Sequence, residues 1–105
     1  SSVYQMCIYK VRIKSVSNSV TYNKKKKSYT QRIKFTIISC IKSGGFHPGM
    51  CKMSINSTLT ENILLANKTY SRFLKTGKII KLKYNSASGM NKKGGYSWHN
   101  WRFIK

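Results

Sequence analysis

The chain has 105 residues and carries 21 Lys and Arg against a single acid, Glu61, which gives a formal net charge of +20 at pH 7. Like charges on a small folded body repel one another, so a chain this basic is expected to work against a polyanion that screens it. Nucleic acid is the commonest such partner, and glycosaminoglycan, teichoic acid and anionic membrane follow. One carboxylate excludes paired-carboxylate glycosidases, two-metal phosphoryl transfer and calcium-binding loops.

The apolar content of 40% predicts a single folded domain over residues 1–105, with one modest hydrophobic core. The first residue is Ser1 rather than Met, so we expect a fragment or the mature part of a longer chain. No apolar run is long enough to predict a transmembrane segment. An intracellular or organellar location is favoured over secretion, which stays open.

The three cysteines allow at most one intrachain disulfide, so no disulfide framework is predicted. Cys40, His47 and Cys51 lie close together in the sequence, but their spacing matches no zinc motif. We therefore expect isolated buried thiols, no metal and no cofactor.

Alternation of apolar and polar residues predicts strands in the first half of the chain. The first strand covers residues 3–16, and the most regular one covers 29–42. Between them, the polar stretch 17–28 contains four consecutive lysines and predicts the tip of a long hairpin. Three Gly and the single Pro predict a loop at 43–51, and 53–58 is a candidate short strand.

The apolar spacing then changes and predicts a helix over about residues 59–75. Thr58 and Glu61 fit a capping box, in which each side chain satisfies a free backbone amide of the other. An apolar stripe at helical spacing follows: Ile63, Ala66, Tyr70 and Leu74. Lys75 and Gly77 fit a helix end. Because the cap would occupy Glu61, any catalysis would use His, Lys, Arg, Tyr or Cys.

The last third of the chain predicts a strand at 78–84, a basic loop at 85–95 and a closing strand at 96–104. Alternation on the closing strand divides its rings between two faces. The first face holds Tyr96, Trp98, Asn100 and Arg102, and the second holds His99, Trp101 and Phe103. We expect Trp101 to lie in the core and Trp98 to be accessible beside Arg102.

The predicted fold is α+β and β-rich, an antiparallel sheet of four to five strands with the helix at about 59–75 packed on its apolar face. The other face would be cationic, and its cations and rings suit the phosphates and unstacked bases of RNA or single-stranded nucleic acid. An acidic partner protein or a larger ribonucleoprotein assembly could also neutralise the charge. The predicted binding residues are Lys10, Arg12, Lys14, Lys24, Lys25, Lys26, Lys27, Arg32, Lys34, Lys81, Lys83, Lys92, Lys93, Tyr96, Trp98 and Arg102.

An alternative function is a small metal-independent ribonuclease of the toxin type. Such enzymes cleave RNA with a His pair, or with His and Lys, doing acid–base work on the 2′-hydroxyl and the leaving group. His47 and His99 are the candidate catalytic residues. A second alternative is a secreted or surface module that binds anionic glycans or lipids.

The second alternative comes from a resemblance. The stretches NKTYSRFLKTGKIIKLKY (67–84) and GGYSWHNW (94–101) resemble the C-terminal module of vertebrate lipoprotein-type lipases. The resemblance implies a β-sandwich that binds lipid and heparin, with 67–84 as strand rather than helix. It covers about 35 residues, requires a sizeable gap, and lacks the acids of that family's strand.

Overall fold

The computed structural model describes residues 2–47 and 49–105. Strands dominate the chain, and the helical segments are short. The elements in chain order are β1 (Ser2–Val16), β2 (Thr21–Asn23), β3 (Ser28–Gly45), α1 (Met50–Met53), β4 (Thr58–Leu65), the 3-10 helix η1 (Lys68–Phe73), β5 (Ile79–Asn91) and β6 (Gly94–Ile104). Pro48, within the predicted loop 43–51, lies outside the described residues.

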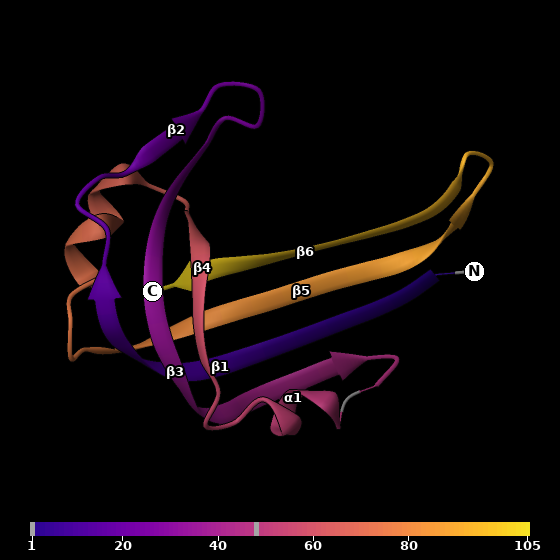
Figure 1. The fold of residues 1–105 in the computed structure, drawn as a ribbon, viewed down its shortest axis with the longest axis horizontal. Helices are drawn as coiled ribbons and strands as arrows, with labels where there is room; N and C mark the ends of the chain where they lie inside the picture. Colours follow the sequence, from indigo (N-terminus) through magenta and orange to yellow (C-terminus); the bar gives the residue numbers. More distant parts are fainter. Residues whose placement is uncertain (1, 48) are drawn as a thin grey trace.

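Five strands form a closed barrel (Figure 1). The sheet runs β1-β5-β6-β4-β3, and a further pairing of β1 with β3 closes it, while β2 adds to the outer edge of β3. All pairs are antiparallel except β4 with β6, which is parallel. The predicted β-rich character is confirmed, but the plain antiparallel sheet with a packed helix is wrong. The sheet instead packs against itself, as barrels do.

Strict alternation along the strands fills the barrel with apolar side chains. The deepest of them are Phe35, Ile13, Ile33, Ile37, Ile63, Leu82 and Val11. Trp101 joins this core from β6 at 5% exposure, and its ring packs edge-on against Phe35 at 5.1 Å. Basic side chains occupy the alternate positions and point outward, as the sequence predicted.

The helix predicted over 59–75 is wrong. Residues Thr58–Leu65 form β4, which pairs along its whole length with β3. Burial along β4 alternates, with Ile63 and Leu65 in the core, so the period is that of a strand. Only the end of the predicted helix is helical, as the 3-10 segment η1, whose N-cap Asn67 accepts a hydrogen bond from the Thr69 amide.

The 3-10 helix η1 closes one end of the barrel. The Phe73 ring stacks on Phe103 at 5.7 Å, and Tyr70 meets Phe103 edge-on at 5.9 Å. Leu74, just beyond η1, is 3% exposed. Of the apolar stripe predicted for a helix, only Ala66 is therefore outside the core, and it is exposed.

The predicted loop at 85–95 is instead a long hairpin. β5 continues to Asn91 and pairs with β6 from Lys81↔Ile104 to Asn91↔Gly94. At the turn, Asn91 accepts a hydrogen bond from the Lys93 amide, and Gly94 has a φ of 120° that favours glycine. With the first half of β1 beside it, this hairpin extends from the barrel as an arm (Figure 1), and the end of β3 pairs with β1 along Gln5–Ile8.

A disulfide between Cys7 and Cys51 joins β1 to α1, so the prediction of isolated thiols is wrong for these two residues. Cys40 is a free thiol. The predicted short strand at 53–58 is wrong, because Met53 ends α1 and turns follow until Thr58. The hairpin tip at 17–28 is confirmed, since β2 pairs with the start of β3 across the turn 24–27.

The resemblance to the lipase module does not extend to the fold. A β-sandwich has two packed sheets, whereas here every strand belongs to one sheet that closes on itself. The segment 67–84 contains η1 before β5 begins, rather than a continuous strand. Within the described residues, no helix has the length and apolar character needed to cross a membrane.

Candidate nucleic-acid interface and neighbouring pockets

Three adjacent strands bring basic side chains together on the outside of the barrel. Lys10 on β1 lies directly opposite Lys81 on β5. Lys83 on β5 lies directly opposite Arg102 on β6. Since β1, β5 and β6 are consecutive in the sheet, these two like-charge pairs form one surface, which we call the cationic surface.

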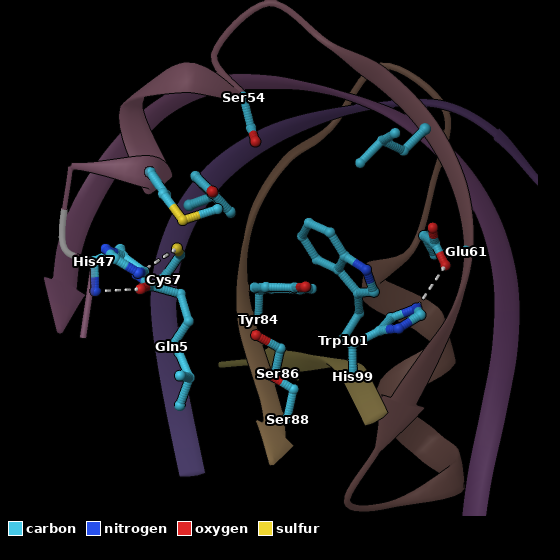
Figure 2. Close-up of a pocket in the computed structure, with 14 residues that line it drawn as sticks. Gln5, Cys7, His47, Ser54, Glu61, Tyr84, Ser86, Ser88, His99 and Trp101 are labelled. Atoms are coloured by element: carbon cyan, nitrogen blue, oxygen red, sulfur yellow. Dashed lines mark hydrogen bonds and ion pairs between the residues drawn. The ribbon is translucent and has the colours of Figure 1, made fainter. Parts of the chain in front are cut away.

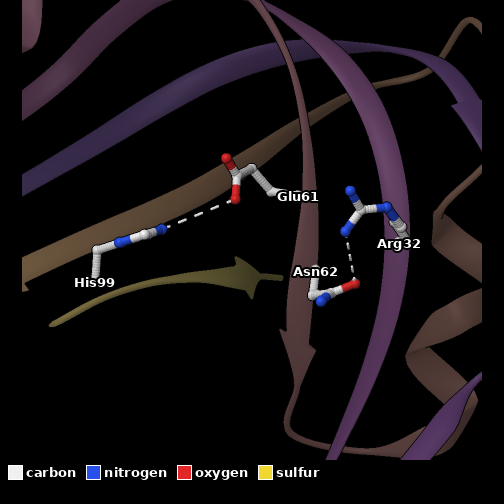
Figure 3. Close-up of polar contacts among 4 residues, drawn as sticks. All are labelled: Arg32, Glu61, Asn62 and His99. Atoms are coloured by element: carbon white, nitrogen blue, oxygen red, sulfur yellow. Dashed lines mark hydrogen bonds and ion pairs between the residues drawn. The ribbon is translucent and has the colours of Figure 1, made fainter.

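The cationic surface continues onto neighbouring positions of β1 and β3. Arg12 and Lys14 follow Lys10 on the outward side of β1, and all three are exposed. Arg32 and Lys34 point outward from β3, the other neighbour of β1 in the closed barrel. Arg32 donates a hydrogen bond to Asn62 Oδ1 at 3.4 Å (Figure 3).

The loop lysines lie apart from the cationic surface. Lys24 to Lys27 form the turn between β2 and β3, and Lys92 and Lys93 form the tip of the arm. Figure 1 shows these two turns at different corners of the molecule. The fourteen basic residues among the sixteen predicted binding residues therefore form one strand surface and two separate basic tips, rather than one sheet face.

A basic cavity of about 590 Å³ adjoins the cationic surface at the η1 end of the barrel. Phe73, Ile80 and Phe103 supply an apolar floor. Six cations surround it: Lys10, Arg72, Lys75, Lys78, Lys81 and Lys105. The Arg72 guanidinium lies 4.9 Å from the centre of the Phe73 ring. The sequence did not single out Arg72, Lys75, Lys78 or Lys105 as binding residues, because local patterns do not show that the barrel brings them beside Lys10 and Lys81.

Two aromatic rings lie on the outward side of the arm. Trp98 is 47% exposed and Tyr96 is 36% exposed. Their cross-strand neighbours on β5 are the small residues Ala87 and Gly89, so little side chain covers the rings. The prediction that Trp101 is buried and Trp98 accessible on the side of Arg102 is confirmed.

An inner pocket of about 450 Å³ opens where the barrel meets the arm (Figure 2). Tyr84, Ser86 and Ser88 on β5 line it between its two sides. His47 lies on one side and His99 on the other, so the structure brings both predicted catalytic histidines to one pocket.

The loop that carries His47 is fixed to β1. The His47 amide donates a hydrogen bond to Gln5 Oε1 at 3.2 Å, and the disulfide from Cys7 anchors α1 directly after this loop. The His47 ring packs edge-on against Phe46 at 4.7 Å.

Tyr9 lies in the same inner pocket and is 2% exposed. Burial raises the pKa of its phenol above the ordinary value, and a hydrogen bond with the Ser54 side chain opposes that effect. The neutral phenol is therefore the stable form of Tyr9 in the folded protein.

The only acid of the chain faces His99. Glu61 Oε1 lies 3.9 Å from His99 Nε2 (Figure 3). The pair occurs where β4 and β6 separate, since their parallel pairing includes only Ile63↔Trp101 and Leu64↔Arg102. Glu61 and His99 come two residues earlier on each strand and extend toward each other across the opening. The expected role of Glu61 as a helix cap is therefore wrong.

The opening between β4 and β6 is also accessible from outside, as a cleft of about 600 Å³. Glu61 and His99 line it together with Trp98, Asn100 and, from the β2–β3 turn, Lys26. The Asn100 Oδ1 atom is buried, and no described residue donates a hydrogen bond to it. Sequence reasoning missed Glu61 and Asn100 as site residues. The alternation Leu59, Glu61, Ile63, Leu65 was the signal that could have placed Glu61 on the inward side of a strand.

Among the described residues, no group of three or more His, Cys, Asp or Glu side chains is arranged to hold a metal ion. No protein-family model, curated protein or solved structure matches the chain.

Proposed function

We propose that this protein binds RNA or other single-stranded nucleic acid through the cationic surface and the basic cavity beside it. The observation that carries the proposal is the pairing of Lys10 with Lys81 and of Lys83 with Arg102. Like charges directly opposite on neighbouring strands destabilise a sheet. Glu61 cannot offset them, because it lies on the inward side of β4. A bound polyphosphate would remove the repulsion and release counterions.

The basic cavity offers both kinds of contact that a nucleotide needs. Its six cations can hold phosphates, while the half-buried Phe73 and the exposed Ile79 offer apolar contact to a base. Trp98, farther along the outward side of β6, offers a second ring to an unstacked base. Single strands expose their bases for such contacts, whereas a duplex does not.

The topology supports nucleic-acid binding by analogy, but on other elements than the cationic surface. Counting the five barrel strands in chain order, their sequence around the barrel is 1-2-3-5-4-1, with the third and fifth parallel. That is the arrangement of the OB-fold, a five-stranded Greek-key barrel that binds oligonucleotides and oligosaccharides through its second and third strands and the loops 1–2 and 4–5. In this chain those elements are β3, β4 and the turns that carry Lys24 to Lys27 and Lys92 and Lys93. Fold alone does not determine function, so the charges and rings carry the argument.

A salt titration tests the proposal. Binding of a fluorescent single-stranded RNA is measured by anisotropy at several NaCl concentrations for the wild type and for the double variant Lys10→Ala/Lys81→Ala. For single strands, the slope of log K against log salt changes by about 0.7 for each phosphate contact. We expect weaker binding by the double variant and a slope shallower by about 1.4.

The double variant Lys52→Ala/Lys68→Ala is the matched control. It removes the same charge from exposed positions on α1 and η1 that line neither the cavity nor the cationic surface. Equal losses in both double variants would mean that net charge, rather than this surface, attracts RNA. Affinity that does not change with salt, or preferential binding to heparin or anionic liposomes over RNA of matched charge, would contradict the proposal.

A further inference from the structure

The His99–Glu61 pair has the composition of a general-base site. With its Nε2 directed at Glu61, the imidazole presents Nδ1 as the basic nitrogen, and the carboxylate can stabilise the imidazolium that forms when Nδ1 takes a proton. A histidine oriented by a carboxylate is the usual activating group in proton-transfer catalysis. The sole acid of a chain with a net charge of +20 is thus placed beside a histidine at an opening.

A purely structural role explains the pair poorly. The separation of 3.9 Å is longer than a hydrogen bond, and the side chains are 58% and 29% exposed for His99 and Glu61. Ion pairs with that much solvent contact stabilise a fold by about 0–1 kcal/mol. The two strands are held together by Ile63, Trp101 and the core around them rather than by this contact.

The outer cleft suits RNA better than the inner pocket does. No Lys or Arg is among the described residues that line the inner pocket, whereas Lys26 lines the cleft. Trp98 lines the cleft as well, and its exposed ring can stack on a base. A phosphate, a base and the general-base pair can therefore meet in the cleft.

We propose that the β4–β6 cleft cleaves RNA without a metal ion, with His99 as the general base, Glu61 as its positioning residue and Lys26 as the general acid. The inference rests on the proposed RNA binding. His99 Nδ1 takes the proton of a ribose 2′-hydroxyl, and the 2′-oxygen attacks the adjacent phosphorus. The P–O5′ bond breaks, and Lys26 gives a proton to the leaving 5′-oxygen. The products are a 2′,3′-cyclic phosphate and a 5′-hydroxyl, and water returns the proton from His99 to Lys26.

The test separates cleavage from binding. End-labelled single-stranded RNA is incubated with protein in EDTA, and the products are resolved on a denaturing gel. Binding is measured in parallel by anisotropy on the 2′-O-methyl RNA of the same sequence, which lacks the attacking hydroxyl. We expect the wild type to cut RNA but not the methylated strand, and to leave cyclic phosphate ends.

The variants assign the roles. His99→Ala should slow cleavage by about 100-fold or more, the lower range for general-base catalysis, and leave binding within about twofold. Glu61→Gln should slow cleavage while Glu61→Asp restores part of it, which a purely structural contact would not produce at equal melting temperatures. Lys26→Ala should slow cleavage as well. His47→Ala is the matched control and should cleave like the wild type, because His47 does not line the cleft.

The other possible results contradict the proposed cleavage site in the β4–β6 cleft. Binding of the methylated strand without cleavage of RNA would overturn the cleavage site and leave the proposed binding function intact. If the protein neither binds nor cleaves RNA, both the binding function and the cleavage site are overturned. Cleavage that survives His99→Ala, or that His47→Ala abolishes, would place the chemistry elsewhere. Circular dichroism verifies that each variant is folded. His47 and His99 are exposed, so we expect their replacement by Ala to leave the fold intact.

Discussion

Trp98 and Trp101 are three residues apart on β6 but meet different surroundings. Trp101 lies among Phe35, Tyr84 and Tyr9 in the core. Trp98 lies opposite Ala87 on the outward side, and about half of its surface is open to solvent. Its ring therefore offers an apolar face without disturbing the packing of the barrel.

Trp98→Ala is expected to weaken binding of single-stranded RNA by about 1–3 kcal/mol, the range for losing one stacked base. The melting temperature should hardly change, because the ring contributes little to the core. Anisotropy titrations against RNA measure the loss. Phe46→Ala, which removes a ring that is 67% exposed elsewhere on the molecule, serves as the control. Unchanged affinity in Trp98→Ala, or an equal loss in both variants, would contradict a stacking role.

For single residues, the sequence predicted on which face of a strand a side chain lies better than it predicted what that side chain does. Period-two alternation separated Trp98 from Trp101 because the backbone of a strand alone sets that pattern. The role of Glu61 could not be predicted in the same way. It depends on His99, which follows it by 38 positions and approaches only because β4 and β6 separate just before their short parallel pairing.

The β4 segment shows how an element can be misassigned. Thr58 and Glu61 satisfy the local rule for a helix start, and the apolar residues beyond them have helical spacing. Those local preferences amount to at most a few kcal/mol and lose to tertiary pairing. In the barrel β4 pairs with β3 on one side and β6 on the other, and neither partner can be read from the segment itself.

Two substitutions distinguish the strand from a helix. Ile63→Ala should destabilise the protein by about 2–5 kcal/mol, because Ile63 is fully buried in the barrel. Ala66→Lys should change the free energy of unfolding by less than about 0.5 kcal/mol, because Ala66 is exposed after the end of β4. Urea denaturation measures both. In the predicted helix the two residues share one buried stripe, so a comparable loss at Ala66 would favour that helix.

On the scale of the whole molecule, the charge was the most informative property of the sequence, and the closure of the barrel was the least predictable. The net charge follows from the amino-acid composition alone and does not depend on the fold. Closure depends on β1 pairing with β3 as well as with β5, and on β4 pairing with β6. Alternation indicates that strands exist, but not which strands are neighbours.

Self-repulsion should make the stability of the free protein depend on salt. The radius of gyration is 14.4 Å. The Debye length falls from about 30 Å at 0.01 M salt to about 8 Å at 0.15 M, so repulsion across the whole molecule is screened within this range. We expect the melting temperature to rise with NaCl, by about 4–8 °C for each 1 kcal/mol of relieved repulsion.

Thermal melts followed by circular dichroism at the two salt concentrations measure this effect. An uncharged osmolyte at matched osmolality serves as the control, because it does not screen charge. A melting temperature that is flat or that falls with salt would show that the like-charge pairs on β1, β5 and β6 cost the fold little.

The parallel pairing of β4 with β6 has a consequence for biosynthesis. β6 follows every other strand in the chain, and it supplies Trp101 and Phe103 to the core. A nascent chain that lacks β6 therefore exposes the inner sides of β4 and β5, and the barrel closes only after β6 has left the ribosome. The two cysteines of the disulfide, Cys7 and Cys51, emerge much earlier. In an oxidising compartment they are therefore available to join β1 to α1 while the barrel is still open.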